Sequence, residues 1–364
     1  MKILYCAPFP KKRFFGGISI IAESLKNKTD MFKNFDVELA FFNTEVMDRE
    51  DKTKGKIKLI NLVSFFRLKN KLIKEIKSND YDCLHVNTSF GIALLKDLLL
   101  IKSIKFNKKL VLQIHFCNFV EVFGRRKFFS NLLLSLIEKH VDNVIVLSEK
   151  FKKELSVKLK KTKIVTLYNF QDAITDEDAV TTKKDTKIKN LLFLGSIDER
   201  KGLLDTIKAL KGIDKETYHF YVGGKLYGSD YEKMVKNEIS ENGMENNVTF
   251  LGYVQNEDKI KRLLSSDIFI LPSYGEGLPI SVIESIAAGL VIISSNVGAL
   301  DEIIANNVNG FTINPGDIKM LNTYISKCLN DEVLLNKIKN NNRKIADQYC
   351  IDTYIENLCK FYKI

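Results

Sequence analysis

The sequence predicts an α/β protein built from two Rossmann-like, doubly wound domains that face each other across a cleft. A chain of 364 residues suits two domains of about 150–200 residues. Short apolar runs alternate with segments of helical length, and this alternation stops in a polar stretch and then starts again. Open parallel sheets bind ligands beyond the carboxyl ends of their strands, so we expect the site in the cleft.

Residues 1–170 are predicted to form the first domain. Their apolar runs of 4–6 residues are rich in β-branched and aromatic side chains, which is typical of buried strands. The predicted strands are Lys2–Ala7, Val37–Phe42, Cys83–Val86, Leu110–His115, Asn143–Leu147 and Ile164–Tyr168. The predicted helices between them include Ser19–Lys28, Phe65–Lys77, Lys127–His140 and Glu149–Leu159.

Residues 171–189 are rich in Thr, Lys and Asp without apolar periodicity, which predicts a linker. The alternation resumes over residues 190–347, the predicted second domain. Its predicted strands are Asn190–Leu194, His219–Val222, Val248–Leu251, Asp267–Leu271 and Leu290–Ser294. Residues 348–364 predict a last helix, because apolar residues recur at helical spacing from Ile351 to Phe361.

The composition excludes several classes of protein. An apolar fraction of 45% excludes global disorder, and no apolar run approaches the ~18 residues of a membrane-spanning helix. The first ten residues make a poor secretory signal, so we expect a cytoplasmic protein. The six cysteines and four histidines show no metal-ligand spacing, so we expect reduced thiols, no structural metal and no cofactor.

The most informative motif spans residues 271–290. A strand is predicted to end at Leu271, a loop with two glycines follows, and Pro279 occupies an N1-type position at the start of a helix. Amides at a helix start form an anion site that suits a diphosphate. Glu276 in the loop and Glu284 in the helix could accept hydrogen bonds from the hydroxyls of a sugar and a ribose. On spacing alone, two solvated glutamates are an equally good interpretation.

A second motif spans residues 191–202. An apolar strand ends in Gly195, and Arg200, Lys201 and Gly202 open the next helix. Two cations beside a helix start suit the neutralisation of a departing nucleoside diphosphate without metal. A solvated basic helix start is the alternative.

Together these motifs resemble the signature of family 4 retaining glycosyltransferases of the GT-B fold. The resemblance rests on Pro272-Ser273-x-x-Glu276-Gly277-x-Pro279 followed by Glu284-Ser-x-Ala-x-Gly289. It implies that Glu276 lies beside the transferred sugar, that Glu284 binds the ribose, and that the amides of Gly277 and Leu278 contact the diphosphate. It also implies that Arg200 and Lys201 clamp this diphosphate, although Ser196 stands where many members carry an arginine.

The resemblance assigns further positions. The pair Gly16-Gly17, after a loop with Lys11, Lys12 and Arg13, would contact the diphosphate or the acceptor. His115 would lie near the donor sugar, although by itself it is more typical of a structural histidine. Gly223-Gly224 and Tyr253-Val254 would line the diphosphate and base pockets. The first domain would bind the acceptor, the second the nucleotide sugar, and the last helix would cross back to the first domain.

The net charge of +11 is uneven. Residues 1–170 carry 33 Lys and Arg against 17 Asp and Glu, a net charge of +16, so we expect an anionic partner. Segments 65–71 and 123–129 mix cations with phenylalanines, which suits an anionic membrane surface or single-stranded nucleic acid. A solvated lysine-rich surface is the plain alternative.

We therefore expect a metal-independent, retaining glycosyltransferase that moves a hexose or N-acetylhexosamine. The donor would be a nucleotide sugar, with UDP favoured, and the acceptor a lipid-linked or surface glycan of the lipopolysaccharide or capsule type. The enzyme would be peripheral on the inner face of the cell membrane. The alternatives are a nucleotide-sugar epimerase on the same fold and a basic nucleic-acid-binding protein; neither explains Glu276 together with Glu284.

Overall fold

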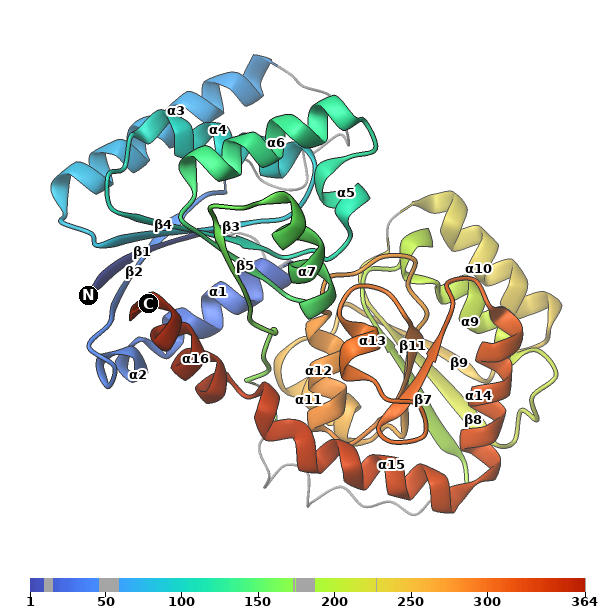
Figure 1. Cartoon of the computed structure of the whole chain (residues 1–364). Helices are drawn as coiled ribbons and strands as arrows, with labels where there is room; N and C mark the ends of the chain where they lie inside the picture. Colours follow the sequence, from blue (N-terminus) through green and yellow to red (C-terminus); the bar gives the residue numbers. More distant parts are fainter. Residues whose placement is uncertain (10–15, 46–58, 173, 175–186, 227, 364) are drawn as a thin grey trace. The chain divides into compact units, whose positions relative to one another are not determined.

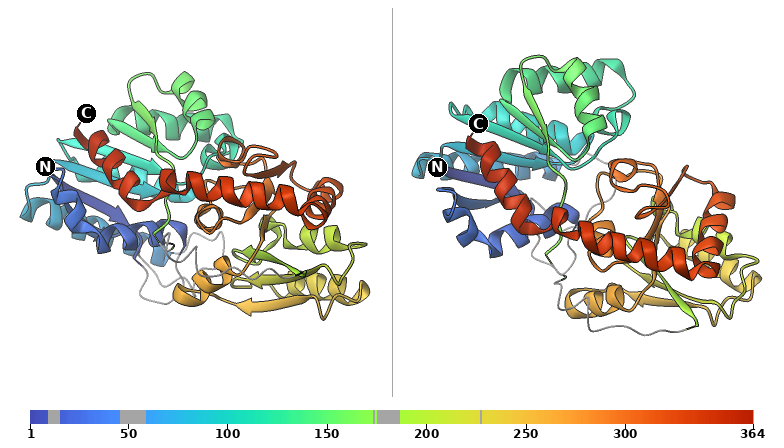
Figure 2. Two further views of the ribbon diagram at one scale, coloured as in Figure 1. Left: turned by 90° about the horizontal axis from the view of Figure 1, so that it is seen from below. Right: turned by 60° about the horizontal axis from the view of Figure 1, so that its bottom comes forward.

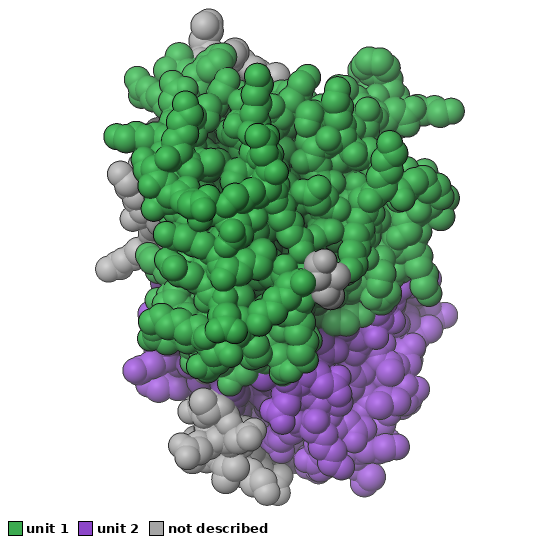
Figure 3. Space-filling model, turned by 60° about the vertical axis from the view of Figure 1, so that its left-hand side comes forward, with its two compact units in different colours: residues 1–169, 351–364 green, residues 170–350 purple. Residues whose placement is uncertain are grey.

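The computed structural model describes residues 1–9, 16–45, 59–172, 174, 187–226 and 228–363. The chain forms two compact units, coloured separately in Figure 3. Unit 1 comprises residues 1–169 and 351–364, and unit 2 comprises residues 170–350. Most of the predicted linker 171–189 lies outside the described residues. The cleft between the domains stays a prediction. No helix in the described ranges is long and apolar enough to cross a membrane.

Unit 1 is built on a parallel sheet with the strand order β2-β1-β3-β4-β5-β6 (Figure 1). All six predicted strands are present, with ends shifted by up to two residues. The four inner strands are buried apolar runs, whereas the edge strands β2 and β6 are only partly buried. They are β1 (Lys2–Ala7), β2 (Glu38–Asn43), β3 (Cys83–Thr88), β4 (Lys109–Ile114), β5 (Asn143–Val146) and β6 (Lys163–Thr166).

Helices cover both faces of this sheet. Helices α3, α4 and α6 lie on one face, and α1 and α16 lie on the other (Figure 1). The helices of unit 1 are α1 (Gly17–Asn27), α2 (Thr29–Lys33), α3 (Leu59–Ser78), α4 (Ile92–Ile104), α5 (Phe119–Phe123), α6 (Lys127–His140), α7 (Glu149–Lys158) and α16 (Ile351–Lys363). The predicted helix 127–140 has the predicted ends, and the other predicted helices differ from theirs by one to six residues.

The last helix, α16, completes unit 1 although it follows unit 2 in the sequence (Figure 2). Its apolar face is buried, as the helical spacing predicted. The Tyr362 hydroxyl hydrogen-bonds Nδ1 of His85 on β3 at 2.5 Å, and Gln113 Nε2 on β4 donates to the Tyr354 hydroxyl at 3.2 Å. The two chain termini lie close together, because the Met1 amino group donates to the Asp36 carbonyl at 2.8 Å and Lys363 Nζ lies 3.9 Å from an Asp36 carboxylate oxygen.

Because His85 is buried, we expect the folded protein to lose stability in acid. Burial, followed by the charge of His115, lowers the pKa of His85 to about 3, whereas an unfolded histidine titrates near ~6.5. The unfolded chain therefore binds more protons between these two values. The contribution of His85 to the unfolding free energy is fully present above pH 6.5 and falls toward pH 3, by at most about 1.4 kcal/mol per pH unit.

Urea unfolding at pH 7.5 and pH 5.0 measures this effect. We expect His85→Gln, which keeps a side chain able to hydrogen-bond the Tyr362 hydroxyl, to lose less stability between the two pH values than the wild type. His219→Gln, at a partly exposed histidine, should follow the wild type more closely. An equal loss in His85→Gln and the wild type would contradict the assignment.

Unit 2 repeats the architecture with the parallel strand order β12-β11-β10-β7-β8-β9. The five predicted strands are present, and a sixth, β12, was not predicted because it is only a four-residue Gly-Phe-Thr-Ile segment. The strands are β7 (Lys189–Leu194), β8 (Tyr218–Gly223), β9 (Val248–Gly252), β10 (Ile268–Leu271), β11 (Val291–Ser295) and β12 (Gly310–Ile313).

The helices of unit 2 connect these strands (Figure 1). The α-helices are α9 (Leu203–Leu210), α10 (Ser229–Glu241), α11 (Asn256–Leu264), α12 (Ile280–Ala287), α13 (Leu300–Ile303), α14 (Ile318–Asn330) and α15 (Glu332–Ile345). Two short 3₁₀ helices, η2 (Glu199–Lys201) and η3 (Ala346–Tyr349), precede α9 and α16.

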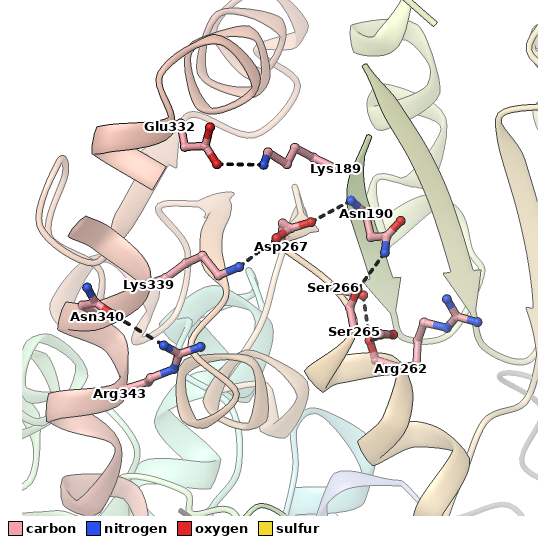
Figure 4. Close-up of polar contacts among 10 residues, drawn as sticks. All are labelled: Lys189, Asn190, Arg262, Ser265, Ser266, Asp267, Glu332, Lys339, Asn340 and Arg343. Atoms are coloured by element: carbon pink, nitrogen blue, oxygen red, sulfur yellow. Dashed lines mark hydrogen bonds and ion pairs between the residues drawn. The ribbon is translucent and has the colours of Figure 1, made fainter. Parts of the chain in front are cut away.

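Polar contacts join α15 to the amino ends of β7 and β10 (Figure 4). Asp267 accepts from the Asn190 amide at 2.9 Å and from Lys339 Nζ at 2.7 Å, and Lys189 pairs with Glu332 at 3.2 Å. Partly buried charged pairs of this kind fix the position of a helix on a sheet edge. They lie at the edge opposite the carboxyl ends of the strands, where ligands bind.

Candidate active site

The sheet of unit 2 has its topological switch point between β7 and β10. Along the chain the strands run from β7 outward through β8 to β9, and the next strand, β10, then pairs with the other side of β7. Doubly wound sheets bind ligands at such a point, beyond the carboxyl ends of the two strands. The loops that follow β7 and β10 carry the two predicted motifs.

The structure brings Glu276 together with both predicted cations. Lys201 Nζ donates to Glu276 Oε1 at 2.6 Å, and Arg200 Nη1 lies 3.7 Å from the same oxygen. Arg200 also donates to the Gly275 carbonyl at 2.6 Å. Only 6% of Glu276 is exposed, so the interpretation of this residue as solvated is wrong. The three side chains form one charged cluster at the switch point.

Close backbone contacts hold the two loops together. The φ angle of Gly202 is +72°, and a Cβ atom at this position would lie 2.2 Å from the Pro272 carbonyl oxygen. Gly298, at φ +64°, approaches the Gly277 carbonyl oxygen in the same way, at 2.3 Å for a Cβ atom. Larger residues would therefore push the loops apart. Gly202 is the N-cap of α9, so Arg200 and Lys201 lie in η2, immediately before the α-helix that they were predicted to open.

Glu284 forms a second buried ion pair. It lies in α12, is 4% exposed, and its Oε1 accepts from Lys259 Nζ at 2.5 Å. The interpretation of Glu284 as a helix-surface residue is therefore wrong. The Lys259 side chain, on α11, is 21% exposed. Both predicted glutamates are thus buried carboxylates that a lysine neutralises, as buried charges require.

Three glycines lie at the carboxyl ends of the neighbouring strands β7 and β8, at the same edge of the unit 2 sheet as Glu276. The Gly195 amide donates to the Gly223 carbonyl at 3.0 Å, and a Cβ on Gly224 would lie 1.7 Å from the Gly195 oxygen. A Cβ on Gly223 would lie 2.5 Å from a Val254 methyl carbon. These four residues therefore lie together, and Tyr253 beside them is 38% exposed. No larger side chain fits at Gly223 or Gly224 without displacing its neighbours.

The loop after β10 leads directly into α12. Gly277 and Leu278 are buried, and the Gly277 carbonyl accepts from the Ala299 amide at 2.9 Å. Pro279 is the N-cap of α12, and not its first helical residue as predicted. The difference is one position, and the helix start remains at the predicted place beside Glu276. Contact of the Gly277 and Leu278 amides with a diphosphate stays a prediction.

The remaining predicted residues lie in unit 1. Gly16 is the N-cap of α1 and Gly17 its first residue, so this helix begins two residues earlier than predicted and includes Gly17. The cations of residues 11–13 lie outside the described residues. His115 follows the last residue of β4, and its Nε2 lies 2.8 Å from Asn87 Oδ1. Burial lowers the pKa of His115 to about 3, so its imidazole is neutral at pH 7. Its predicted place beside the donor sugar stays a prediction.

Sequence reasoning missed two residues of this site. Lys259 gave no signal because it is one of several charged residues on the amphipathic helix α11, and the pairing of α11 with α12 is a property of the fold. Gly298 lies three residues after β11, and a glycine in the loop that follows a buried strand was the available signal. Among the described residues, no group of three His, Cys, Asp or Glu side chains could hold a metal ion.

Comparison with known proteins agrees with this geometry. The model of group 1 glycosyl transferases matches residues 174–345, and the model of glycosyltransferase family 4 matches residues 49–173. This chain belongs to the family 4 type of glycosyltransferases. The two matches divide the enzyme near the boundary between units 1 and 2.

Two relatives share moderate sequence identity with this glycosyltransferase. A 41.2 kDa protein of the cps region of Klebsiella pneumoniae is 25% identical over 264 residues, 70% of this chain and 71% of that protein. The amylovoran biosynthesis glycosyltransferase AmsK of Erwinia amylovora is 31% identical over 137 residues, 36% of this chain and 33% of that protein.

Solved structures share the GT-B fold. A sucrose-phosphate synthase from Thermosynechococcus elongatus has a TM-score of 0.78 at 16% identity, covering 100% of this chain and 98% of that one. Anabaena HepE in complex with UDP and glucose has a TM-score of 0.75 at 17% identity, covering 100% and 99%.

Proposed function

We propose that this glycosyltransferase moves a hexose or an N-acetylhexosamine from a UDP-sugar to a lipid-linked or surface-glycan acceptor, with retention and without metal. The observation that carries the proposal is the pair of buried glutamates, each neutralised by a lysine, beside the switch point of unit 2. UDP is favoured because Anabaena HepE, which shares the fold, was solved with UDP and with UDP-glucose.

Each charged group has a distinct role in the proposal. Glu276 accepts hydrogen bonds from hydroxyls of the transferred sugar, and Glu284 accepts from the ribose hydroxyls. Arg200 and Lys201 contact the diphosphate. Lys201 already lies 2.6 Å from Glu276, so one ammonium group with three donors can bind the carboxylate and a phosphate oxygen together.

The transfer step needs no protein nucleophile. The acceptor hydroxyl oxygen forms a bond to C1 of the sugar on the face from which the diphosphate leaves, and the bond between C1 and the phosphate oxygen breaks. The acceptor proton passes to the departing phosphate. Arg200 and Lys201 stabilise the charge that develops on the diphosphate, the work that a divalent cation does in other transferases. Glu276 holds the sugar in place for the attack.

The acceptor side of the proposal rests on unit 1. Its sequence carries the positive charge of the chain, which suits an acceptor with a phosphate or diphosphate group on a lipid carrier. We infer that the enzyme works on the cytoplasmic side, peripheral on the inner face of the cell membrane. A role in the biosynthesis of a surface polysaccharide agrees with the names of its relatives from Klebsiella and Erwinia.

A donor screen tests the proposal. We expect UDP-sugars to raise the melting temperature in the presence of EDTA, because a ligand at 100 times its Kd stabilises the native state by about 2.7 kcal/mol. GDP- and ADP-sugars should give smaller shifts. If no nucleotide sugar stabilises the protein, the assignment of the site is wrong; if only a magnesium-loaded sample responds, metal independence is wrong.

The anomeric configuration of the product separates the remaining alternatives. We expect NMR of the transferred product to show the configuration of the donor, and an inverted product would overturn retention. Isotope exchange from solvent at C2 of the sugar without an acceptor would instead indicate an epimerase.

A further inference from the structure

Three helices of unit 1 expose apolar side chains on one face of the molecule. α3, α4 and α6 lie side by side on the same face of the sheet (Figure 1). Each exposes two large apolar residues, spaced three, seven and four positions apart, so that each pair shares one side of its helix. These residues are Val63 and Phe66 on α3, Ile92 and Leu99 on α4, and Phe128 and Leu132 on α6. We call this surface the α3–α4–α6 layer.

The α3–α4–α6 layer is also strongly cationic. The three helices carry nine Lys and Arg against three acids. Each acid is already engaged. Glu75 accepts from the Tyr81 hydroxyl at 2.6 Å, Asp97 is buried and accepts from Thr88, and Glu138 accepts from the backbone amide of residue 161 at 3.2 Å. Arg125 and Arg126 are exposed immediately before α6 and add two further cations. Lys96 pairs with Asp97 at 3.1 Å, and the eight other Lys and Arg of the three helices face only two further acids, Glu75 and Glu138. The apolar residues therefore stand among a surplus of cations.

The opposite face of the same sheet shows neither property. α1 and α16 together carry three cations and three acids, and two of these cations pair on their own helix. None of their described residues is an exposed large apolar residue. The face covered by α1 and α16 therefore lacks both the surplus of cations and the exposed apolar residues of the α3–α4–α6 layer.

We propose that the α3–α4–α6 layer docks this protein onto an anionic lipid bilayer. Apolar side chains among cations fit this partner, because the cations meet lipid phosphates while the apolar groups enter the boundary between headgroups and acyl chains. The layer brings together segments 65–71 and 123–129, which are far apart in the sequence, and adds the apolar residues of α4 between them. It defines which face of unit 1 the membrane contacts.

A nucleic acid fits this layer less well. Single-stranded nucleic acids bind through bases that stack on aromatic rings, and four of the six exposed apolar residues are aliphatic. Phe66 and Phe128 lie on helices that flank α4, with Ile92 and Leu99 on the helix between them. Aliphatic groups enter lipid readily and offer no stacking surface.

Co-sedimentation with vesicles tests the proposal on the full chain. We expect binding to vesicles of phosphatidylglycerol and phosphatidylcholine, and at least tenfold weaker binding to phosphatidylcholine alone. Binding should fall as NaCl rises from 0.05 to 0.5 M. The variant Phe128→Ser with Leu132→Ser should bind the mixed vesicles at least tenfold more weakly. The matched control is Val333→Ser on α15 of unit 2, because Val333 and Phe128 are both 83% exposed; it should bind as the wild type does.

Two outcomes would overturn the proposal. One is unchanged vesicle binding by the Phe128→Ser, Leu132→Ser variant while circular dichroism shows it folded. The other is a wild type that ignores anionic vesicles, or that releases them to an unrelated single-stranded oligonucleotide. Binding of UDP by the same variant should stay at the wild-type value, so a failure of this proposal is separate from a failure of the proposed function.

Discussion

Replacing Arg200 and Lys201 together by alanine should lower kcat/KM for sugar transfer by about 10⁴-fold and leave the fold intact. Each cation approaches Glu276 at the switch point, where the proposed diphosphate leaves. Removing one group that stabilises a developing charge typically costs 10²–10³-fold in rate, and removing two cations leaves the departing diphosphate without positive charge from this loop. Steady-state kinetics with a UDP-sugar measure the loss.

A matched pair of cations separates this effect from a general loss of charge. Lys208 and Lys211 are exposed on and just after α9, close in sequence to the predicted clamp. Their double alanine variant removes the same charge and should keep wild-type kinetics. Transfer at the normal rate by the Arg200→Ala, Lys201→Ala protein would refute the clamp.

Glu284→Ala should weaken binding of UDP by about 10–100-fold. A hydrogen bond to a charged group contributes about 1.5–3 kcal/mol, and the proposed ribose contacts use this carboxylate. The variant also leaves Lys259 without its partner, 2.5 Å away in the wild type. Calorimetric titration of UDP measures the change.

Lys259→Met should weaken UDP binding in the same direction, because it leaves Glu284 as a buried carboxylate without its cation. Lys259→Arg should restore part of the affinity. Lys261→Met is the control on the same helix, since the Lys261 side chain is 75% exposed and pairs only loosely, at 3.9 Å, with Glu257. If Lys259→Met and Lys261→Met bind UDP equally well, Lys259 does not position Glu284.

Most of the fold could be predicted from the sequence, because parallel strands that are buried on both faces appear as continuous apolar runs. Lys2–Ala7 and Lys127–His140 have the ends that the pattern predicted. β12 escaped prediction because four residues beginning with glycine resemble a loop as much as a strand. The start of α3 is also earlier than predicted, at Leu59.

The site residues of unit 2 were predicted from two motifs together with the family resemblance, but their ion-pair partners were not predicted. Glu276 and Lys201 are 75 positions apart and meet only because β7 and β10 are neighbours in the sheet. Glu284 and Lys259 are 25 positions apart and meet because α11 leads into β10 and α12 follows it. A single sequence contains no signal for such pairs, because tertiary contacts decide which charges are buried together.

Calorimetric titration of UDP into the full chain with EDTA present tests the central claim most directly. The proposed site predicts saturable binding of one UDP per chain, weakened by Glu284→Ala and by the Arg200→Ala, Lys201→Ala pair, and unchanged by Lys208→Ala with Lys211→Ala. Wild-type protein that binds no nucleoside diphosphate, or that binds UDP equally well after these site substitutions, would contradict it.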